Sequence, residues 1–148
     1  MITMTPDVGN REVFFRISKM EKMTKKSIHN ALFEIGKEHV DHAKELMLEK
    51  KTGRIYKIGK INHQASAPGE APAILTRSLF SNLDYAVRGH QELEFGDKEQ
   101  AGKLPIGKYL EEGTTNIEPR PHIGRTVMEQ YRNTNNTLIS YIKKANRQ

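Results

Sequence analysis

Histidine and carboxylate side chains whose spacing could support chemistry occur first between residues 38 and 42. His39 and His42 stand three apart, beside Glu38 and Asp41, in a segment of helical periodicity. Residues three apart lie on roughly the same side of a helix, where two imidazoles can bind one metal ion. The sequence has no third ligand at a recognised spacing and no HExxH motif. We therefore expect a solvated helix face here and no metal site.

The second candidate is the pair Glu111 and Glu112. Adjacent residues on a helix point about 100° apart, so these carboxylates cannot face each other as an acid/base pair. The sequence also lacks a Walker loop, a GxGxxG segment and a GxSxG elbow. We expect a protein that is not an enzyme and that uses no cofactor.

Composition limits the architecture that can position these residues. The 148 residues suit one domain, 1–148, and the absence of cysteine excludes disulfides and thiolate metal sites. We expect roughly the first ten and last four residues to be loose. No stretch approaches the roughly 20 apolar residues of a membrane span, and the N-terminus lacks the features of a signal peptide. The expectation is a soluble protein of a cytoplasm that does not enter a membrane.

Hydrophobic periodicity predicts an α+β fold, with a small antiparallel β-sheet packed on one face by two long amphipathic helices. The long helices are expected at residues 25–50, after a cap at Thr24 and before a stop at Gly53, and at 121–145. The expected strands and hairpin are 12–18, 54–61 and 84–97; the short helices are 77–83 and 107–112; the loops are 63–76, which is proline-rich and extended, and 96–104.

Charge is unevenly distributed along the chain, whose formal net charge is +6. Residues 84–118 carry an excess of acid, whereas 119–148 and a basic patch carry an excess of base. Opposite charges on different faces suit head-to-tail packing of identical copies, although mixed solvated charge explains the pattern as well. The basic patch is Lys50, Lys51, Arg54, Lys57 and Lys60.

Nucleic-acid binding is an alternative interpretation of the basic patch, because Tyr56 lies within it and could stack on a base. Aromatic residues make up only 7% of the chain, and no known nucleic-acid-binding module can be traced. An ordinary charged strand edge also accounts for the patch.

Residues 67–79 read APGEAPAILTRSL, and residues 109–123 read YLEEGTTNIEPRPHI, just before the expected last helix. Together these two motifs resemble the head-to-tail joining, or tail-completion, family of long-tailed bacteriophages. The family has an APGEPP-type loop before a Thr-Gly-x-Leu-like segment, then a Glu-Phe-Gly-Thr turn before Pro-Arg-Pro-Phe and a closing helix. The chain also has a Thr-Gly-Arg segment within 50–54. It departs from the family at Arg77, Glu111, His122 and Ile123. His122 stands where the family has a phenylalanine, and a polar histidine at this position argues against a buried anchor there. The matching residues are Ala67, Pro68, Gly69, Glu70, Ala71, Pro72, Thr76, Ser78, Leu79, Leu110, Glu112, Gly113, Thr114, Pro119, Arg120 and Pro121.

The resemblance implies a structural virion protein of the phage neck. Such proteins form a ring, commonly of six copies, that joins the head connector to the tail tube and touches passing DNA only weakly and without specificity. The implied location is the virion, with assembly in the host cytoplasm. A small basic DNA-binding protein and a host-directed inhibitor remain alternatives. The residues expected at the contacts with sister copies and axial partners are Pro68, Gly69, Glu70, Pro72, Glu112, Gly113, Thr114, Pro119, Arg120 and Pro121.

The stretch from Gly113 to Pro121 has a physical interpretation of its own. Gly113 can take the positive torsion that ends a short helix, and Pro119 and Pro121 stiffen the approach to the last helix. Arg120 is then held either toward a carboxylate of an adjacent copy or toward Glu112 or Glu118 of its own chain. The first alternative predicts a subunit contact, and the second predicts only a stiff helix entry.

Overall fold

The computed structural model describes residues 2–7, 12–17, 25–89, 91–98 and 104–145. For the two N-terminal strands, residues 2–7 and 12–17, this description covers the backbone. The predicted cap at Thr24, part of the loop 96–104 and the last three residues lie outside the described residues.

The described chain forms a four-stranded antiparallel sheet in the order β1-β2-β6-β5 and a separate two-stranded hairpin. The sheet contains β1 (Ile2–Asp7), β2 (Glu12–Ile17), β5 (Leu83–Arg88) and β6 (Glu92–Asp97). Chain neighbours β1 and β2, and β5 and β6, pair as hairpins, while β2 pairs with β6 to join the two halves of the sheet.

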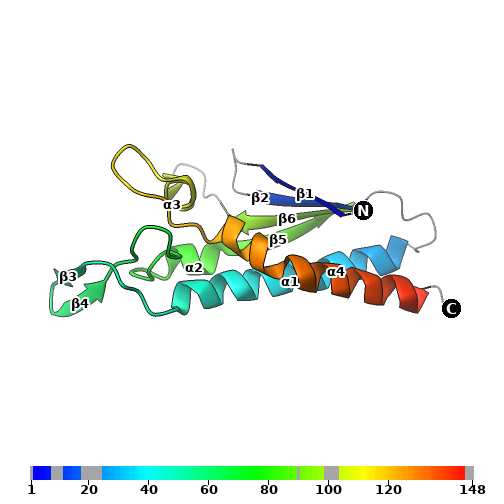
Figure 1. The fold of residues 1–148 in the computed structure, drawn as a ribbon, viewed down its shortest axis with the longest axis horizontal. Helices are drawn as coiled ribbons and strands as arrows, with labels where there is room; N and C mark the ends of the chain where they lie inside the picture. The colour runs from blue at the N-terminus through cyan, green and yellow to red at the C-terminus, as the bar shows by residue number, and fades with distance from the viewer. Residues whose placement is uncertain (1, 8–11, 18–24, 90, 99–103, 146–148) are drawn as a thin grey trace.

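Two long helices, α1 (Lys25–Leu48) and α4 (Ile123–Ala145), pack against each other and against one face of the sheet (Figure 1). The predicted α+β architecture is therefore confirmed. Every apolar position of α1 that faces the interior recurs at three- or four-residue spacing, which is why this segment is helical. The core contains Ile28, Ala31, Leu32, Ile35, Val40, Ala43, Met47, Leu83, Leu93, Phe95, Ile123, Val127 and Leu138.

The prediction of one strand over residues 54–61 is wrong. The segment folds into a hairpin of β3 (Ile55–Ile58) and β4 (Ile61–Gln64), with Gly59 at φ 61° in the turn. Gly59 tolerates this torsion because it has no Cβ, and the turn allows the second half of the segment to pair with the first. β4 therefore occupies the first residues of the predicted loop 63–76.

Several element boundaries also differ from the predictions. Residues 2–7, expected to be loose, form the edge strand β1, and α1 ends at Leu48, well before Gly53. Residues 96 and 97, expected in a loop, complete β6. The short helices are α2 (Ser78–Asn82) and α3 (Ile106–Glu112), close to the predicted ranges, and α4 begins at Ile123, two residues after Pro121. No helix in the described part of the chain is long and apolar enough to cross a membrane.

Close contact between α1 and the sheet depends on Gly36, which is buried on α1 opposite β5. A Cβ at Gly36 would lie 2.6 Å from Cγ of Tyr85, well inside van der Waals contact. Glycine costs helix stability, so its presence here follows from the space that the Tyr85 ring fills.

We predict that Gly36→Ala lowers the free energy of unfolding by about 1–3 kcal/mol, although alanine is the better helix former, because the methyl group overpacks the α1–β5 contact. Urea unfolding measures the change. The matched control is Lys37→Ala, at the next and exposed position of α1. A stabilised Gly36→Ala variant would contradict the packing argument.

Candidate functional site

The two motif segments that are far apart in sequence meet in the fold. The Gly69 N–H donates to the Pro119 carbonyl at 2.9 Å, and Nε of Arg120 donates to the Ser66 carbonyl at 3.1 Å. Residues 65–72 and 113–122 thus form one joined unit at the end of α1 and the start of α4. We call this unit the motif junction.

Arg120 stabilises the motif junction through hydrogen bonds within its own chain. Its Nη1 donates to the Glu118 carbonyl at 2.6 Å, and its own N–H donates to the Leu110 carbonyl at 2.6 Å. The guanidinium therefore binds backbone carbonyls of two segments, and neither the Glu112 nor the Glu118 carboxylate is its hydrogen-bond partner. The alternative in which Arg120 pairs with Glu112 or Glu118 is therefore wrong, because Nε and Nη1 instead fasten the junction. The alternative contact with a carboxylate of an adjacent copy stays a prediction.

Glu70 closes the other side of the junction. Its carboxylate accepts from the Thr52 hydroxyl at 2.5 Å, from the Thr52 N–H at 3.1 Å and from the Ala67 N–H at 2.8 Å. The hydrogen bond from the Thr52 side chain, followed by those from the two backbone groups, holds the pKa of Glu70 at about 2. The Thr-Gly-Arg segment and the Pro-Gly-Glu loop are thereby tied together.

Gly113 takes the expected positive torsion, with φ 77°, at the end of α3. The next residues form a tight turn, in which the Thr114 N–H donates to the Ile117 carbonyl at 2.8 Å. A Cβ at Gly113 would lie 2.7 Å from the Ile117 oxygen and 3.0 Å from Cδ of Pro119. Only glycine fits both the torsion and the space, so this part of the prediction is confirmed.

Glu111, which the sequence analysis set aside, organises the start of α4. Its carboxylate accepts hydrogen bonds from three successive backbone N–H groups, those of His122 at 2.8 Å, Ile123 at 3.0 Å and Gly124 at 2.8 Å. The first N–H groups of a helix have no partner within it, and the positive end of the helix dipole attracts an anion. A carboxylate from the preceding helix supplies both needs.

His122 lies at the centre of the same cluster and is fully buried, so the doubt about an anchor at this position is removed. Its Nε2 donates to Oδ2 of Asp97 at 3.0 Å, and its Nδ1 lies 2.9 Å from Oε2 of Glu111. We call Asp97, Glu111 and His122 the carboxylate–histidine cluster. It joins the end of β6, the end of α3 and the start of α4.

The charges of the cluster support one another. Burial lowers the pKa of His122, but the hydrogen bonds and charges of Asp97 and Glu111 outweigh it and raise the pKa to about 9. Burial raises the pKa of Glu111, but the hydrogen bond and charge of His122 and the backbone donors hold it at about 2. The imidazole is therefore charged at neutral pH and lies between two carboxylates. Because the imidazole is fully buried, it joins the three elements from inside the protein.

The expectation that His39 and His42 lie on a solvated face of α1 is wrong. His39 is fully buried, its Nδ1 donates to the Ile35 carbonyl at 2.8 Å, and its ring meets Phe95 edge to face. Burial lowers the pKa of His39 to about 4, so it is a neutral core residue. His42 instead faces α4, where its Nε2 lies 2.8 Å from Oε2 of Glu129. The sequence spacing did not reveal that α4 covers one side of this segment.

The basic patch is smaller than predicted. Lys51 is buried and its Nζ donates to the Leu46 carbonyl at 2.7 Å, which satisfies an end carbonyl of α1. Burial lowers the pKa of Lys51. The exposed members of the patch are Lys50, Arg54, Lys57 and Lys60.

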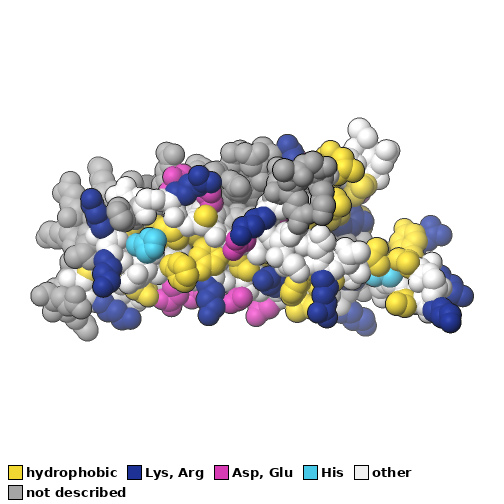
Figure 2. All heavy atoms as spheres, turned by 180° about the vertical axis from the view of Figure 1, so that it is seen from behind, with side chains coloured by type: hydrophobic (Ala, Val, Ile, Leu, Met, Phe, Trp, Pro, Cys, Tyr) yellow, Lys and Arg dark blue, Asp and Glu magenta, His cyan; other side chains and the backbone are white. Residues whose placement is uncertain are grey.

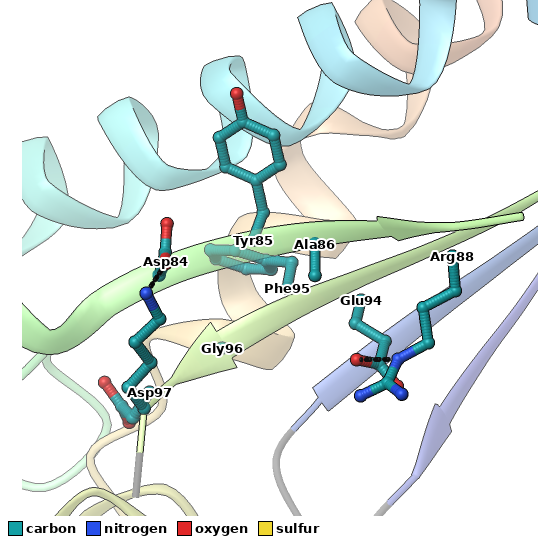
Figure 3. Close-up of a pocket in the computed structure, with 9 residues that line it drawn as sticks. Asp84, Tyr85, Ala86, Arg88, Glu94, Phe95, Gly96 and Asp97 are labelled. Carbon is teal, nitrogen blue, oxygen red and sulfur yellow. Dashed lines mark ion pairs between the residues drawn. The ribbon is translucent and has the colours of Figure 1, made fainter. Parts of the chain in front are cut away.

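A hollow of about 320 Å³ lies along β5 and β6 (Figure 3). Asp84 pairs with Lys98 and Glu94 pairs with Arg88, as the dashed lines show, and Asp97 belongs to the carboxylate–histidine cluster. Arg88 and Lys98 belong to the same segment as the carboxylates that they pair, so the ion pairs of the described residues reduce the excess of acid in residues 84–118 only through His122, which comes from outside it.

Among the described residues, no group of three histidine or acidic side chains is arranged to hold a metal ion. Comparisons of the chain with protein-family models, curated proteins and solved structures found no match. The geometry of the motif junction and of the carboxylate–histidine cluster is therefore the basis for a functional proposal.

We predict that Glu111→Gln lowers the free energy of unfolding by about 3 kcal/mol or more, because it leaves a buried imidazolium with one carboxylate fewer. Glu112→Gln, the adjacent exposed control, should change it by less than about 0.5 kcal/mol. Denaturant unfolding of the two variants separates the roles. Equal losses would show that Glu111 is not the capping residue.

The stability should also depend on alkaline pH through His122. Its pKa rises from 6.5 when unfolded to about 9 when folded, so its contribution is complete below 6.5 and is lost as the pH rises through about 9. The difference in unfolding free energy between wild type and His122→Asn should narrow over this range, by on the order of 3 kcal/mol.

An NMR titration of the His122 ring in the wild-type protein tests the same claim without a variant that could fail to fold. The ring should remain protonated well above neutral pH. A midpoint near the ordinary value of 6.5 would contradict the clamped imidazolium.

Proposed function

We propose that the chain is a structural protein of a bacteriophage neck, not an enzyme, and that its copies form a ring between the head connector and the tail tube. The proposal rests first on the resemblance of the two motifs to the tail-completion family. It has one structural observation in its support, the direct contact between those motifs.

That contact matters because chance resemblances at two places in a chain have no reason to meet. Here the Gly69–Pro119 and Ser66–Arg120 hydrogen bonds join the two motif segments. Because the two segments form one hydrogen-bonded unit, there is a physical reason for both motifs to occur in one protein. Ordinary loops need no such pairing.

The motif residues divide into a scaffold and a surface. Glu70, Pro72, Gly113, Arg120 and Pro121 are half-buried or buried, and the bonds described above engage Glu70 and Arg120. The other residues proposed for partner contacts are exposed, and these are Pro68, Gly69, Glu112, Thr114 and Pro119. The scaffold holds the exposed set in a fixed shape, which reduces the entropy lost when a partner binds.

The second candidate function is nonspecific DNA binding, favoured by the exposed cations Lys50, Arg54, Lys57 and Lys60. A DNA-binding protein of this kind should shift a DNA fragment at low salt and release it steeply as salt rises. A neck protein should bind DNA only weakly under the same conditions.

The decisive experiment is removal of the gene from the phage that encodes the chain. We expect filled heads and finished tails that do not join, because the ring that completes the joint is missing. Electron microscopy of lysates measures this, and supplying the wild-type chain from a plasmid should restore joined particles. Infectious particles that lack the chain would refute the proposal.

A further inference from the structure

The β3–β4 hairpin has two chemically different faces. Its register pairs Tyr56 with His63 and Ile58 with Ile61, and opposed residues of an antiparallel pair share a face. These four side chains form what we call the apolar hairpin face. The other face carries Ile55, Lys57, Asn62 and Gln64.

The apolar hairpin face is exposed to solvent. Ile61 is 71% exposed, and Tyr56 and Ile58 are 48% and 46% exposed. Figure 1 shows the hairpin beyond the end of α1, away from the four-stranded sheet and from α3. An isolated two-stranded hairpin is marginal in water, so a face of this kind is stabilised when another surface covers it.

The base of the hairpin is firmly held although its tip is not covered. The Gly53 N–H donates to the Ala65 carbonyl, the Ala65 N–H donates to the Arg54 carbonyl, and Glu70 binds Thr52. The hairpin thus projects in a set direction from the motif junction. Figure 2 shows hydrophobic and basic side chains over this end of the molecule, at the right.

A second exposed apolar surface lies on α3 and the turn that follows it. Ile106 and Tyr109 are three residues apart and therefore neighbours on the helix surface, and Leu104 and Ile106 are 73% and 60% exposed. Two exposed carboxylates, Glu112 and Glu118, accompany them. We call this surface the α3 patch, formed by Leu104, Ile106, Tyr109, Glu112, Ile117 and Glu118.

Charge selects the partner of the hairpin among the exposed apolar surfaces of the described residues. Arg54, which lies over the Tyr56 ring, and Lys60 in the turn flank the apolar hairpin face, whereas Lys57 is on the opposite face. Two apolar hairpin faces that met would therefore bring like charges together. The exposed face of α4, around Met128 and Ile139, also carries basic residues, Arg132, Lys143 and Lys144.

On α1, the exposed apolar residues Phe33 and Leu48 are about 20 Å apart along the helix axis, too far to form one patch. On α4 the exposed carboxylate of Glu129 is already paired with Arg125 and His42. The α3 patch combines clustered apolar side chains with Glu112 and Glu118, exposed carboxylates for which the described residues show no ion pair. It therefore matches the hairpin in both hydrophobicity and charge.

We propose that the apolar hairpin face of one copy docks on the α3 patch of a second copy. The two surfaces differ, so the contact is head to tail, the type that builds rings. The inference deepens the proposed function, on which it rests for the identity of the assembly. The contact itself is a property of the purified chain and is tested there.

The absence of native cysteines permits a direct test by thiol cross-linking. A chain with Ile61→Cys is mixed with a chain with Ile106→Cys and treated with a short bis-maleimide over a concentration series. We expect a covalent pair that contains one chain of each kind, and tandem mass spectrometry identifies the joined residues.

Two matched controls test whether the cross-link is specific to the apolar hairpin face and to the α3 patch. Asn62→Cys lies on the opposite face of the same hairpin, and Met128→Cys lies on α4 at 79% exposure. Ile61→Cys with Ile106→Cys should give several-fold more pair than Asn62→Cys with Ile106→Cys or Ile61→Cys with Met128→Cys. Equal yields at every concentration would overturn the proposal.

Charge reversal supplies an independent readout. Lys60→Glu in the hairpin chain, or Glu112→Lys in the α3-patch chain, should each lower the yield several-fold, and the two together should restore it. Failure of the double reversal to restore the yield would rule out the charge match.

The two proposals can fail separately. A specific cross-link from a chain absent from the phage neck would refute the proposed function and leave the contact intact. A chain seen in the neck without the cross-link would keep the function and refute this contact.

Discussion

The fold depends on a buried histidine held between two carboxylates where three elements meet. Asp97 ends β6, Glu111 lies at the end of α3, and His122 precedes α4. Burial of each charge alone would cost several kcal/mol, so the cluster is favourable only while all its members are in place. The carboxylate of Glu111 also caps α4, so the direction of that helix and the position of the motif junction follow from the same three side chains.

The arrangement holds the motif junction at both of its ends. Arg120 and Pro121 come immediately before His122, so the cluster fixes one end of the junction. Glu70 fixes the other end through Thr52 and Ala67. With both ends held, the junction, which includes the turn after α3, is a rigid base for the hairpin.

The long elements were predictable because their patterns are strong and local. The apolar spacing of α1 identified its buried apolar side chains but not the buried Gly36 and His39, and in α4 the same pattern included Tyr131, which is half exposed. The hairpin was missed because alternation continues across Gly59, whose positive torsion turns the chain. β1 was missed because residues near the N-terminus were expected to be loose; its Pro6 is compatible with an edge strand.

The carboxylate–histidine cluster was not predictable, because its members come from three elements and only the fold brings them together. No local spacing links Asp97 to His122, and the adjacent Glu111 and Glu112 differ only in which one faces inward. The same limit applies to His39 and Lys51, whose polar types suggested solvent and whose buried donors instead bind backbone carbonyls of α1.

The turn after α3 is anchored at both of its ends, while its middle, residues 114–117, is exposed to solvent. The Arg120 N–H donates to the Leu110 carbonyl, and the Glu111 carboxylate accepts hydrogen bonds at the start of α4. The exposed residues between these anchors are Thr114, Thr115, Asn116 and Ile117. Extra residues inserted in the middle of the turn would extend into solvent and leave the anchored residues at its ends in place. The length and composition of this turn can therefore vary while the rest of the domain stays unchanged.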